Sequence, residues 1–308
     1  MDKSLNIVDE DFYGRRLDKF LAEHYKNFSR AYLQKLIADS MVTINGTTIN
    51  KANHKVQLSD QIEVTWPEQK KLELIPEDIP LHFLYQDDDI LVVNKPANMT
   101  VHPGAGNKDG TLVNALLGYS YDEFHKMLDD DVRPGIVHRL DKDTTGVMVI
   151  ARHQQAKSKL SQSFANREVK KIYLALCHDY MDDVEFEVKN HIGRNPNNRK
   201  QMAVVKSGGK LAHSKFTTLD EGDERISLVQ AEIFTGRTHQ IRVHLQYLRN
   251  PIIGDELYGF KSEIIAPRQM LHAYRLSIKH PMTAEEMSFK APIPDDFRSL
   301  MNEHMLIL

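Results

Sequence analysis

Residues 134–151 read PGIVHRLDKDTTGVMVIA and contain the sharpest contrast in the chain. A polar run, residues 138–146, is enclosed by apolar residues. Ile136 and Val137 precede it, and residues 147–150 have the composition of a buried strand. Polar groups placed against core strands cost free energy unless they are paired or take part in function. The stretch therefore predicts a functional loop held between core segments.

Four interpretations of this loop compete. A calcium-binding loop would use Asp141, Asp143 and Thr145 as ligands, but its twelfth position is Arg152, where such loops require glutamate. A phosphorylated aspartate would need nucleotide-binding elements, and none is evident in the sequence. A purely structural turn would bond the side chains of Asp141 and Thr144 to the backbone. The fourth interpretation is an exposed catalytic carboxylate beside an arginine.

Short β-rich runs lie on both sides of this loop, from Leu81 onward. We expect strands over 90–93, 146–151, 173–177 and 228–234, and helices over 111–117 and 154–166. The strand runs do not alternate regularly with helices, which disfavours a doubly wound parallel sheet. The pattern favours an α+β domain with a mixed, largely antiparallel sheet.

The first 66 residues indicate a small separate unit. Leu17, Phe20 and Leu21 recur at helical spacing, and Ser29 is a suitable N-cap for a second helix. The apolar face of that second helix consists of Tyr32, Leu33, Leu36 and Ile37. The turn at residues 45–46, Asn-Gly, favours a tight hairpin, so short strands should follow.

A linker is expected after this unit, because residues 67–80 (PEQKKLELIPEDIP) are charged and proline-rich and show no sustained period. We therefore expect a small domain over 1–66, a linker over 67–80 and a large domain over 81–308.

Positive charge is concentrated in two patches, although the net charge is −3 and the pI is near 6.6. Residues 14–35 hold six Lys/Arg against two acids, and residues 194–215 hold six Lys/Arg and no acid. Such patches are suited to binding a phosphate backbone. The alternative is that both are solvent-exposed charged surfaces without a binding role. The candidate RNA contacts are Arg15, Arg16, Lys19, Arg30, Lys35, Arg199, Lys200, Lys206 and Lys210.

Several segments resemble one enzyme family, in that family's order. HRLDKDTTG at 138–146 matches the signature of the RluA family of large ribosomal-subunit pseudouridine synthases. Further similar segments are KIYLA at 171–175, TGRTHQIRVH at 235–244, PIIGD at 251–255 and LHA at 271–273. VHPGAGN at 101–107 resembles one branch of that family in particular. LDKFL, SRAYLQKLI and VTING, all within the first 66 residues, resemble the α-L, or S4-type, RNA-binding domain.

The resemblance implies an α-L RNA-binding domain followed by a synthase domain that isomerises specific uridines in large-subunit (23S) ribosomal RNA. Asp141 would be the catalytic aspartate, either as nucleophile toward the sugar or as base for a sugar proton. Arg139 would hold or replace the flipped nucleotide, and Tyr173 would stack on the target base. Arg242 would pair with Asp141.

The same resemblance implies that His138 and Leu271 take part in binding the flipped nucleotide. Two other roles are open for Tyr173: a core tyrosine between Ile172 and Leu174, or a hydroxyl that acts as a base at C5 of uracil. Isomerising a uridine changes no oxidation state and removes no group, so the reaction requires no cofactor and no metal.

Arg242 is expected to keep the Asp141 carboxylate ionised in a pocket that excludes water. Burial raises a carboxylate's pKa and a nearby cation lowers it. A guanidinium stays charged, and it can bind a carboxylate in bidentate fashion. At 4 Å the attraction is about 4 kcal/mol for an effective dielectric constant near 20. We expect Thr238 to cap the helix that carries Arg242. Without Asp141 as partner, Arg242 would be an ordinary surface arginine.

Two rival functions remain at this point. A non-catalytic RNA-binding factor for ribosome assembly could use the same basic patches, but simple binding has no use for a buried carboxylate near phosphates. A nucleoside hydrolase or glycosylase would share extrusion of the base and would release free uracil.

Other features indicate a cytoplasmic protein without a membrane-spanning segment or a disulfide. Cys177 is the single cysteine and allows no internal disulfide. No signal segment and no run long enough to cross a bilayer is evident. The glycines of residues 104–110 do not fit a dinucleotide loop, and His239 and His244 do not have zinc-motif spacing. We expect a monomer.

Overall fold

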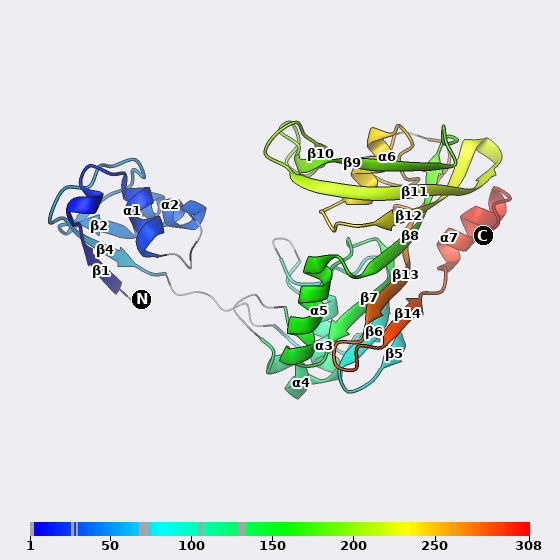
Figure 1. Ribbon diagram of the computed structural model, residues 1–308, viewed down its shortest axis with the longest axis horizontal. Coiled ribbons are helices and arrows are strands. Elements are labelled where there is room, and N and C mark those ends of the chain that lie inside the picture. Colours follow the sequence, from blue (N-terminus) through cyan, green and yellow to red (C-terminus); the bar gives the residue numbers. More distant parts are fainter. Residues whose placement is uncertain are drawn as a thin grey trace. The chain divides into compact units, whose positions relative to one another are not determined.

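The computed structural model describes residues 3–25, 28, 30–67, 74–104, 107–128, 133–260 and 262–308. The chain divides into two compact units, Met1–Leu72 and Glu73–Leu308 (Figure 1). The proposed N-cap Ser29 and residues 68–73 of the expected linker lie outside the described residues. The boundaries 1–66, 67–80 and 81–308 stay a prediction. Among the described residues, no helix has both the length and the apolar character that a bilayer span requires.

The first unit packs two helices on a small sheet. Its elements are β1 (Lys3–Ile7), η1 (Glu10–Phe12), α1 (Leu17–His24), α2 (Arg30–Ala38), β2 (Val42–Ile44), β3 (Thr47–Thr48) and β4 (Gln61–Thr65). The strand order is β1-β4-β2-β3, with antiparallel neighbours. Asn45 and Gly46 form the predicted hairpin turn with φ of 50° and 79°, a conformation that these two residue types tolerate. The predicted apolar faces of α1 and α2 are buried against each other and the sheet.

A buried carboxylate joins the two helices of this unit. The Asp18 side chain is fully buried and accepts bonds from Arg16 Nε at 3.0 Å, Arg16 Nη2 at 3.1 Å and Arg30 Nη2 at 2.7 Å. Gln34 Nε2 donates to it as well, at 2.6 Å. Burial opposes ionisation of Asp18, but these donors outweigh that effect and hold the pKa of the carboxyl well below its usual value. Arg16 and Arg30 therefore help to fold this unit, besides being candidate RNA contacts.

The second unit contains one large sheet with helices on it. Its helices are α3 (Leu112–Tyr119), α4 (Tyr121–His125), α5 (Gln154–Asn166), η2 (Asp223–Arg225), α6 (Gln240–Tyr247) and α7 (Asp295–Glu303). Its strands are β5 (Phe83–Gln86), β6 (Ile90–Lys95), β7 (Thr145–Ala151), β8 (Lys170–His178), β9 (Glu185–Arg194), β10 (Met202–Val204), β11 (Lys210–Gly222), β12 (Ile226–Ile233), β13 (Leu271–Lys279) and β14 (Glu286–Lys290). All predicted strand and helix segments of this unit are confirmed.

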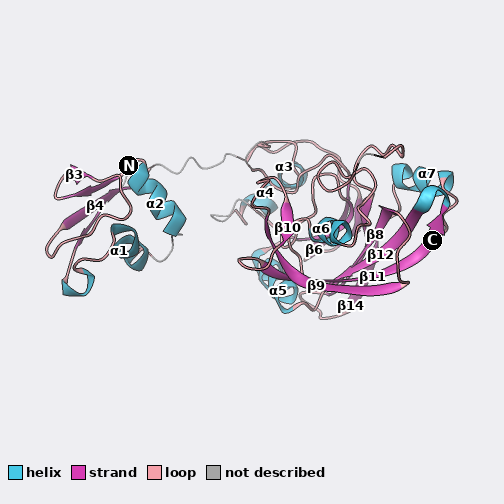
Figure 2. Ribbon diagram, turned by 90° about the horizontal axis from the view of Figure 1, so that it is seen from above, coloured by secondary structure: helices cyan, strands magenta, loops and turns pink. Residues whose placement is uncertain are grey.

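The sheet is mixed and largely antiparallel, as the sequence predicts. Its strand order is β10-β9-β11-β12-β8-β13-β7-β6-β5, and β14 pairs with β13. Among the described strands, only β13 and β7 run parallel. The sheet curves, and α6 lies on its concave side (Figure 2). Strand β7 is buried along its whole length, so the polar loop that precedes it is anchored to the core.

Candidate active site

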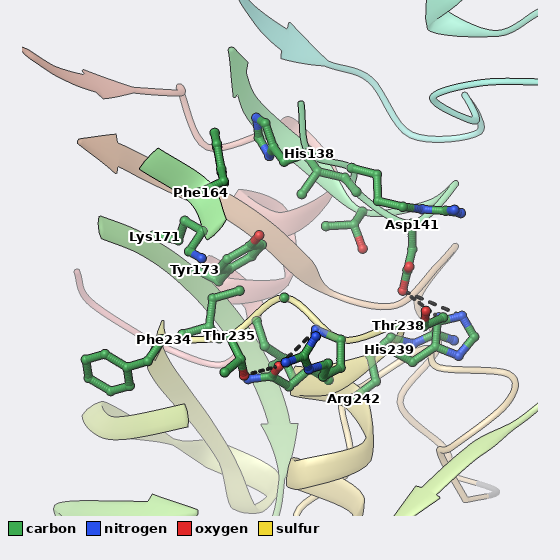
Figure 3. Close-up of a pocket in the computed structure, with 18 of the residues that line it drawn as sticks. His138, Asp141, Phe164, Lys171, Tyr173, Phe234, Thr235, Thr238, His239 and Arg242 are labelled. Atoms are coloured by element: carbon green, nitrogen blue, oxygen red, sulfur yellow. Dashed lines mark hydrogen bonds and ion pairs between the residues drawn. The ribbon is translucent and has the colours of Figure 1, made fainter. Parts of the chain in front are cut away.

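A cavity of about 460 Å³ opens beside the polar loop. Its walls come from residues 137–144, the second half of α5, the start of β8, residues 233–242 and Leu271 (Figure 3). The six residues that the sequence assigned to catalysis or nucleotide binding all line it: His138, Arg139, Asp141, Tyr173, Arg242 and Leu271. Its volume is in the range of small-molecule sites. The cavity therefore collects segments that lie far apart in the sequence.

Asp141 and Arg242 are in direct contact, as expected. Arg242 Nη1 donates to Asp141 Oδ2 at 2.9 Å, and the side chains are 6% and 21% exposed respectively. The expected bidentate geometry of this pair is wrong. The bidentate partner of Arg242 is the fully buried Asp255, which accepts from Nε at 2.6 Å and from Nη2 at 2.8 Å. Asp255 itself is held by the backbone amides of Leu257 and Tyr258. One edge of the guanidinium is thus fixed, and the remaining nitrogen is directed at Asp141.

The cavity lining carries more positive than negative side chains. Asp141 is the single carboxylate among the lining residues, whereas the basic lining residues are Arg139, Arg167, Lys171, Arg237 and Arg242. Burial opposes the charge on Arg242, but Asp255 and Asp141 outweigh it and raise the pKa of the guanidinium. A polyanionic substrate is favoured by this lining, and Asp141 offers one negative group inside it.

His239 also faces Asp141, and the sequence analysis assigned it no role in the site. It has a left-handed backbone, φ 56°, and its Nε2 lies 3.9 Å from Asp141 Oδ2. Its Nδ1 lies 2.8 Å from the Tyr258 hydroxyl, which accepts from the backbone amide of Met202. In the tautomer in which the Tyr258 hydroxyl donates to Nδ1, the imidazole proton is on Nε2, on the side of Asp141.

Tyr173 lies on β8 with its ring on the cavity wall and 8% of its surface exposed. It belongs to the hydrophobic core and also presents a face to the cavity, so the core and stacking interpretations are compatible. Burial, together with the nearby Asp141, raises the pKa of the Tyr173 hydroxyl. A phenol that keeps its proton is a poor base, which disfavours the proposed base role at C5.

His138 is fixed by the protein rather than free to titrate. Its Nε2 accepts the backbone amide of Val149 at 3.0 Å, and its ring stacks on Phe164 at 4.6 Å between centroids. Burial and the neighbouring Lys171 lower the pKa of His138 to about 3. The ring is therefore neutral near pH 7 and orients the start of the polar loop.

Two buried cations hold the other end of this loop. Lys95 Nζ donates to the carbonyl of Lys142 at 2.9 Å and also to two carbonyls of its own turn. Arg268 Nη1 donates to the carbonyl of Asp143 at 3.1 Å, while its Nε and Nη2 bind Asp296 at the start of α7. The backbone directly after Asp141 is thus tied to β6 and to the C-terminal helix. Neither cation was assigned from the sequence.

The helix that carries Arg242 begins differently from the expectation. Thr238 is not its cap, because the left-handed His239 separates Thr238 from the first turn. No side chain caps the helix; the Gln240 side chain instead fixes the segment before it, because its Oε1 accepts from the backbone amide of Arg237 at 3.0 Å and from Thr235 Oγ1 at 2.7 Å. Helix α6 is buried on several sides, so Arg242 reaches the cavity from a packed helix.

The second basic patch is exposed. Arg199, Lys200 and Lys206 lie on the segments that connect β9, β10 and β11, Lys210 begins β11, and all four are exposed. Within the described chain, none of the four forms an ion pair with a carboxylate. Their charges are available to a polyanion. Lys26 of the first patch lies outside the described residues.

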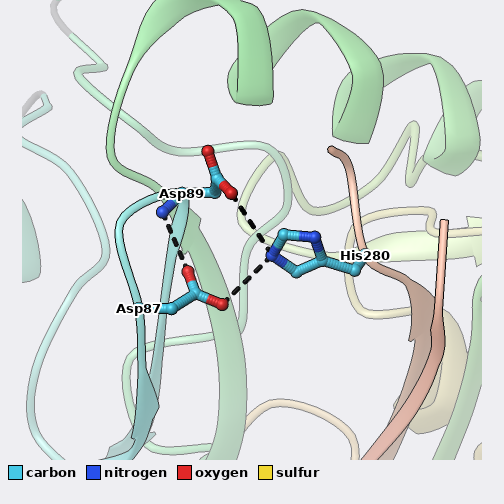
Figure 4. A group of neighbouring side chains, drawn as sticks. All are labelled: Asp87, Asp89 and His280. Carbon is cyan, nitrogen blue, oxygen red and sulfur yellow. Dashed lines mark hydrogen bonds and ion pairs between the residues drawn. The ribbon is translucent and has the colours of Figure 1, made fainter. Parts of the chain in front are cut away.

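Asp87, Asp89 and His280 form a compact group elsewhere in the second unit (Figure 4). His280 Nδ1 accepts the backbone amides of Thr283 at 3.1 Å and Met282 at 3.4 Å, so the imidazole proton is on Nε2. That proton points to Asp87 Oδ2 at 3.1 Å, and no lone pair of the ring is free for a cation. The group joins the β5–β6 and β13–β14 turns.

A basic cavity of this size that contains a carboxylate suits an enzyme that acts on a polyanionic substrate. A sequence model described as RNA pseudouridylate synthase matches residues 89–247, and one described as S4 domain matches residues 15–62. The chain belongs to the RNA pseudouridylate synthase family, whose members are isomerases.

Named relatives cover nearly the whole chain. Ribosomal large subunit pseudouridine synthase D of Vibrio vulnificus is 40% identical over 309 residues, covering 96% of this chain and 92% of the relative. The synthase D of Escherichia coli strain K12 is 38% identical over 307 residues, with the same coverage. A Bacillus subtilis protein named uncharacterized RNA pseudouridine synthase YlyB is 39% identical over 301 residues, covering 96% and 98%. Synthase D is the branch that residues 101–107 resemble.

Solved structures agree with the fold. The human RNA pseudouridylate synthase domain containing 4 has a TM-score of 0.59 and 25% identity, and it covers 74% of this chain and 94% of its own. The human domain containing 1 has a TM-score of 0.56 and 26% identity, covering 77% and 97%. The predicted fold class, an S4-type domain with a mixed-sheet synthase domain, is confirmed.

Proposed function

We propose that this chain isomerises specific uridines in large-subunit ribosomal RNA, with Asp141 as the catalytic carboxylate. The observation that carries the proposal is the contact of Asp141 with Arg242 inside a cavity whose described lining residues include no other carboxylate. The names of the relatives, ribosomal large subunit pseudouridine synthase D, support ribosomal RNA as the substrate.

The chemistry requires few groups. The bond from C1′ to N1 of uracil breaks and leaves its electron pair on N1. The base rotates, a bond forms from C1′ to C5, C5 loses its proton and N1 gains one, so atoms and electrons balance without a second reactant. Asp141 supplies a charged oxygen to the sugar, as nucleophile or as base. Arg242, fixed by Asp255, holds that oxygen in place through a hydrogen bond.

The other cavity residues hold the everted nucleotide. Tyr173 presents a flat aromatic face for the uracil ring. Arg139 is exposed at the cavity mouth and takes the place of the nucleotide or grips it. Leu271 and His138 complete the wall. Confinement of the detached uracil distinguishes this isomerase from a glycosylase, which would release the base to water.

The S4-type unit anchors the RNA. Arg15, Lys19 and Lys35 are exposed on or beside its helices, and Arg30 begins α2, where backbone amides favour anions. Deleting residues 1–66 is expected to leave a folded synthase domain that binds RNA more weakly and less selectively. Unchanged affinity of the truncated protein would remove the S4-type unit from RNA anchoring.

The test of the function is a map of pseudouridines by carbodiimide-dependent stops of reverse transcriptase, on ribosomal RNA from cells with and without this gene. We expect one or a few large-subunit stops to vanish in the deletion strain and to return with the wild-type gene, but not with Asp141→Asn. Identical maps in both strains would reject ribosomal RNA as the substrate. Free uracil in reactions with the purified protein would instead indicate a glycosylase.

A further inference from the structure

His239 faces the proposed catalytic carboxylate, but the reaction described above gives it no role. Its Nε2 lies 3.9 Å from Asp141 Oδ2, the oxygen that also accepts from Arg242 Nη1 at 2.9 Å (Figure 3). A hydrogen bond requires donor and acceptor to lie about 2.7–3.2 Å apart, so His239 and Asp141 are not bonded directly. Both side chains line the cavity and are partly exposed. The space between them is therefore accessible to a substrate in the cavity.

The protein holds the His239 ring in a defined position. Its backbone is left-handed, with φ of 56°, which costs free energy for a residue other than glycine and has to be maintained by the surroundings. Its Nδ1 lies 2.8 Å from the Tyr258 hydroxyl, and the Tyr258 ring meets the imidazole edge-on with 5.5 Å between centroids. The Tyr258 hydroxyl is itself held, because it accepts from the backbone amide of Met202 at 2.7 Å. Tyr258 thus occupies Nδ1 and directs Nε2 at Asp141.

The Asp141 carboxylate favours the tautomer of His239 that has its proton on Nε2. The other tautomer would turn a nitrogen lone pair toward a negatively charged oxygen. Burial lowers the pKa of His239, although Asp141 opposes this effect, so the ring is neutral near pH 7. A neutral N–H group is better suited to an uncharged ligand atom than to a phosphate.

The space between the two side chains has an acceptor on one side, Asp141 Oδ2, and a donor on the other, His239 Nε2. It therefore suits a group that both donates and accepts, as a hydroxyl does. Two atoms 3.9 Å apart can each lie about 2.8 Å from one oxygen placed beside the line that joins them.

The proposed reaction brings a hydroxyl of this kind to Asp141. Whether Asp141 attacks C1′ or removes a sugar proton, the sugar has to lie at its carboxylate, and the 2′-hydroxyl is on the carbon next to C1′. The ring oxygen of the sugar also adjoins C1′, but it can only accept a hydrogen bond, as can the carbonyl oxygens of uracil. The 2′-hydroxyl is therefore the group of the nucleotide that matches both neighbours.

We propose that His239 binds the 2′-hydroxyl of the everted uridine through Nε2, while that hydroxyl donates to Asp141, and that this contact makes the cavity selective for ribose. His239 is then a specificity-determining residue, and Tyr258 is the residue that positions it. The proposal rests on the proposed function, because it places the sugar of a uridine at Asp141. The 2′-hydroxyl is the group by which a protein distinguishes RNA from DNA at a given nucleotide.

The test uses two substitutions of His239 that differ in reach. His239→Asn tolerates the left-handed backbone and keeps an amide near the position of Nδ1, within reach of Tyr258, but it is too short to replace Nε2. His239→Gln is longer and places an N–H donor near the position of Nε2. The matched control is His125→Asn, at an exposed histidine outside the cavity lining.

All variants are made in the Asp141→Asn protein, which keeps an acceptor oxygen at this position and binds the RNA without converting it. The first probe is a synthetic RNA hairpin around a uridine mapped as described above. The second probe is the same hairpin with 2′-deoxyuridine at that one position. The measurement is Kd of each protein for each hairpin, which gives a double-mutant cycle between His239 and the hydroxyl.

With His239 intact, removal of the 2′-hydroxyl is expected to raise Kd about fivefold, the effect of one hydrogen bond. His239→Asn should raise Kd for the ribose hairpin by about the same factor and change Kd for the deoxyuridine hairpin by less than about twofold. His239→Gln should restore most of the preference for ribose, and His125→Asn should retain all of it.

Three results would overturn the proposal. Equal losses of affinity for both hairpins in His239→Asn would show that His239 supports the fold or contacts another part of the RNA. A full preference for ribose in His239→Asn would assign that preference to another residue. Equal Kd values for the two hairpins with His239 intact would show that the hydroxyl is not bound. Failure of the proposed function is detected separately, as absence of pseudouridine from the ribose hairpin treated with the wild-type protein.

Discussion

Asp255 holds Arg242 by two hydrogen bonds, from Nε at 2.6 Å and from Nη2 at 2.8 Å. These two bonds determine which nitrogen of Arg242 can contact Asp141. A guanidinium has a rigid fork, so fixing one edge fixes the direction of Nη1 as well. Asp141 is then approached by one donor, at 2.9 Å, and keeps its other oxygen free of that arginine. The position of Asp141 thus depends on Asp255, a buried carboxylate outside the cavity lining.

Asp255→Asn is expected to impair both stability and turnover. The substitution leaves the buried Arg242 with one carboxylate, and breaking a buried ion pair costs about 3–5 kcal/mol of unfolding free energy. Arg242 is then free to turn toward Asp141, so the rate of pseudouridine formation should fall at least tenfold while RNA affinity changes little. Urea unfolding followed by circular dichroism, and single-turnover assays, measure the two effects. Glu256→Gln, at the exposed neighbouring residue, is the control, and equal effects of both substitutions would contradict the account.

Asp18→Asn should destabilise the first unit alone. Asp18 is fully buried and accepts bonds from Arg16, Arg30 and Gln34, so the loss is expected to be about 3 kcal/mol. Trp66 is the single tryptophan and packs in this unit, which makes its fluorescence a selective probe. The fluorescence transition should move to lower urea, and the circular-dichroism transition of the larger unit should stay in place. A shift of both transitions would show that the two units unfold together.

His138 should make the second unit sensitive to acid. Its pKa is about 3 in the folded protein and about 6.5 when unfolded, so between these values only the unfolded chain binds the proton. Stability from this group is therefore complete above pH 6.5 and falls as the pH drops toward 3. His138→Gln, which retains an acceptor, should reduce the slope of unfolding free energy against pH by up to about 1.4 kcal/mol per unit in that window. The control is His125→Gln, at an exposed residue of α4. An equal slope for His138→Gln and wild type would show that His138 does not cause the acid sensitivity.

The second basic patch should set the salt dependence of RNA binding. The test variant replaces Lys200, Lys206 and Lys210 by glutamine. Each lost phosphate contact lowers the slope of log Kd against log salt by about 0.7–0.9, so three contacts lower it by roughly 2. The control variant replaces three exposed lysines remote in sequence from this patch, Lys126, Lys279 and Lys290. Equal slopes for the two triple variants would exclude the patch from the phosphate track.

Local patterns predicted strands β6, β7, β8 and β12 and helices α3 and α5 of the second unit, but not the other strands of the sheet. The boundaries of α5, at residues 154–166, and the Asn-Gly turn follow from periodicity and turn chemistry. Strands β9 and β11 were not predicted, because residues 185–194 (EFEVKNHIGR) bury only part of one face and resemble a polar connection. Their pairing with each other and with β12 supplies the stability that their composition does not indicate.

Only some residues of the site were predicted, because many of its contacts join residues that are far apart in the sequence. Asp141 and Arg242 are 101 residues apart, so no local pattern of the sequence predicts their contact. The contact was predicted from the family resemblance. Asp255 lay in a segment recognised from that resemblance, but its role depends on the tertiary contact with Arg242. Lys95 and Arg268 act through backbone carbonyls of the loop, which carry no sequence signature. Contacts with the backbone had to be seen in the fold.

The most direct test of the account is single-turnover formation of pseudouridine by Asp141→Asn, with the dissociation constant of the RNA measured on the same protein. Asp143→Asn is the matched control, two residues along the same loop and outside the cavity lining. The account predicts no product from Asp141→Asn, RNA affinity within a few fold of wild type, and product from Asp143→Asn. Product formed by Asp141→Asn at a rate near that of wild type would contradict the catalytic role of Asp141.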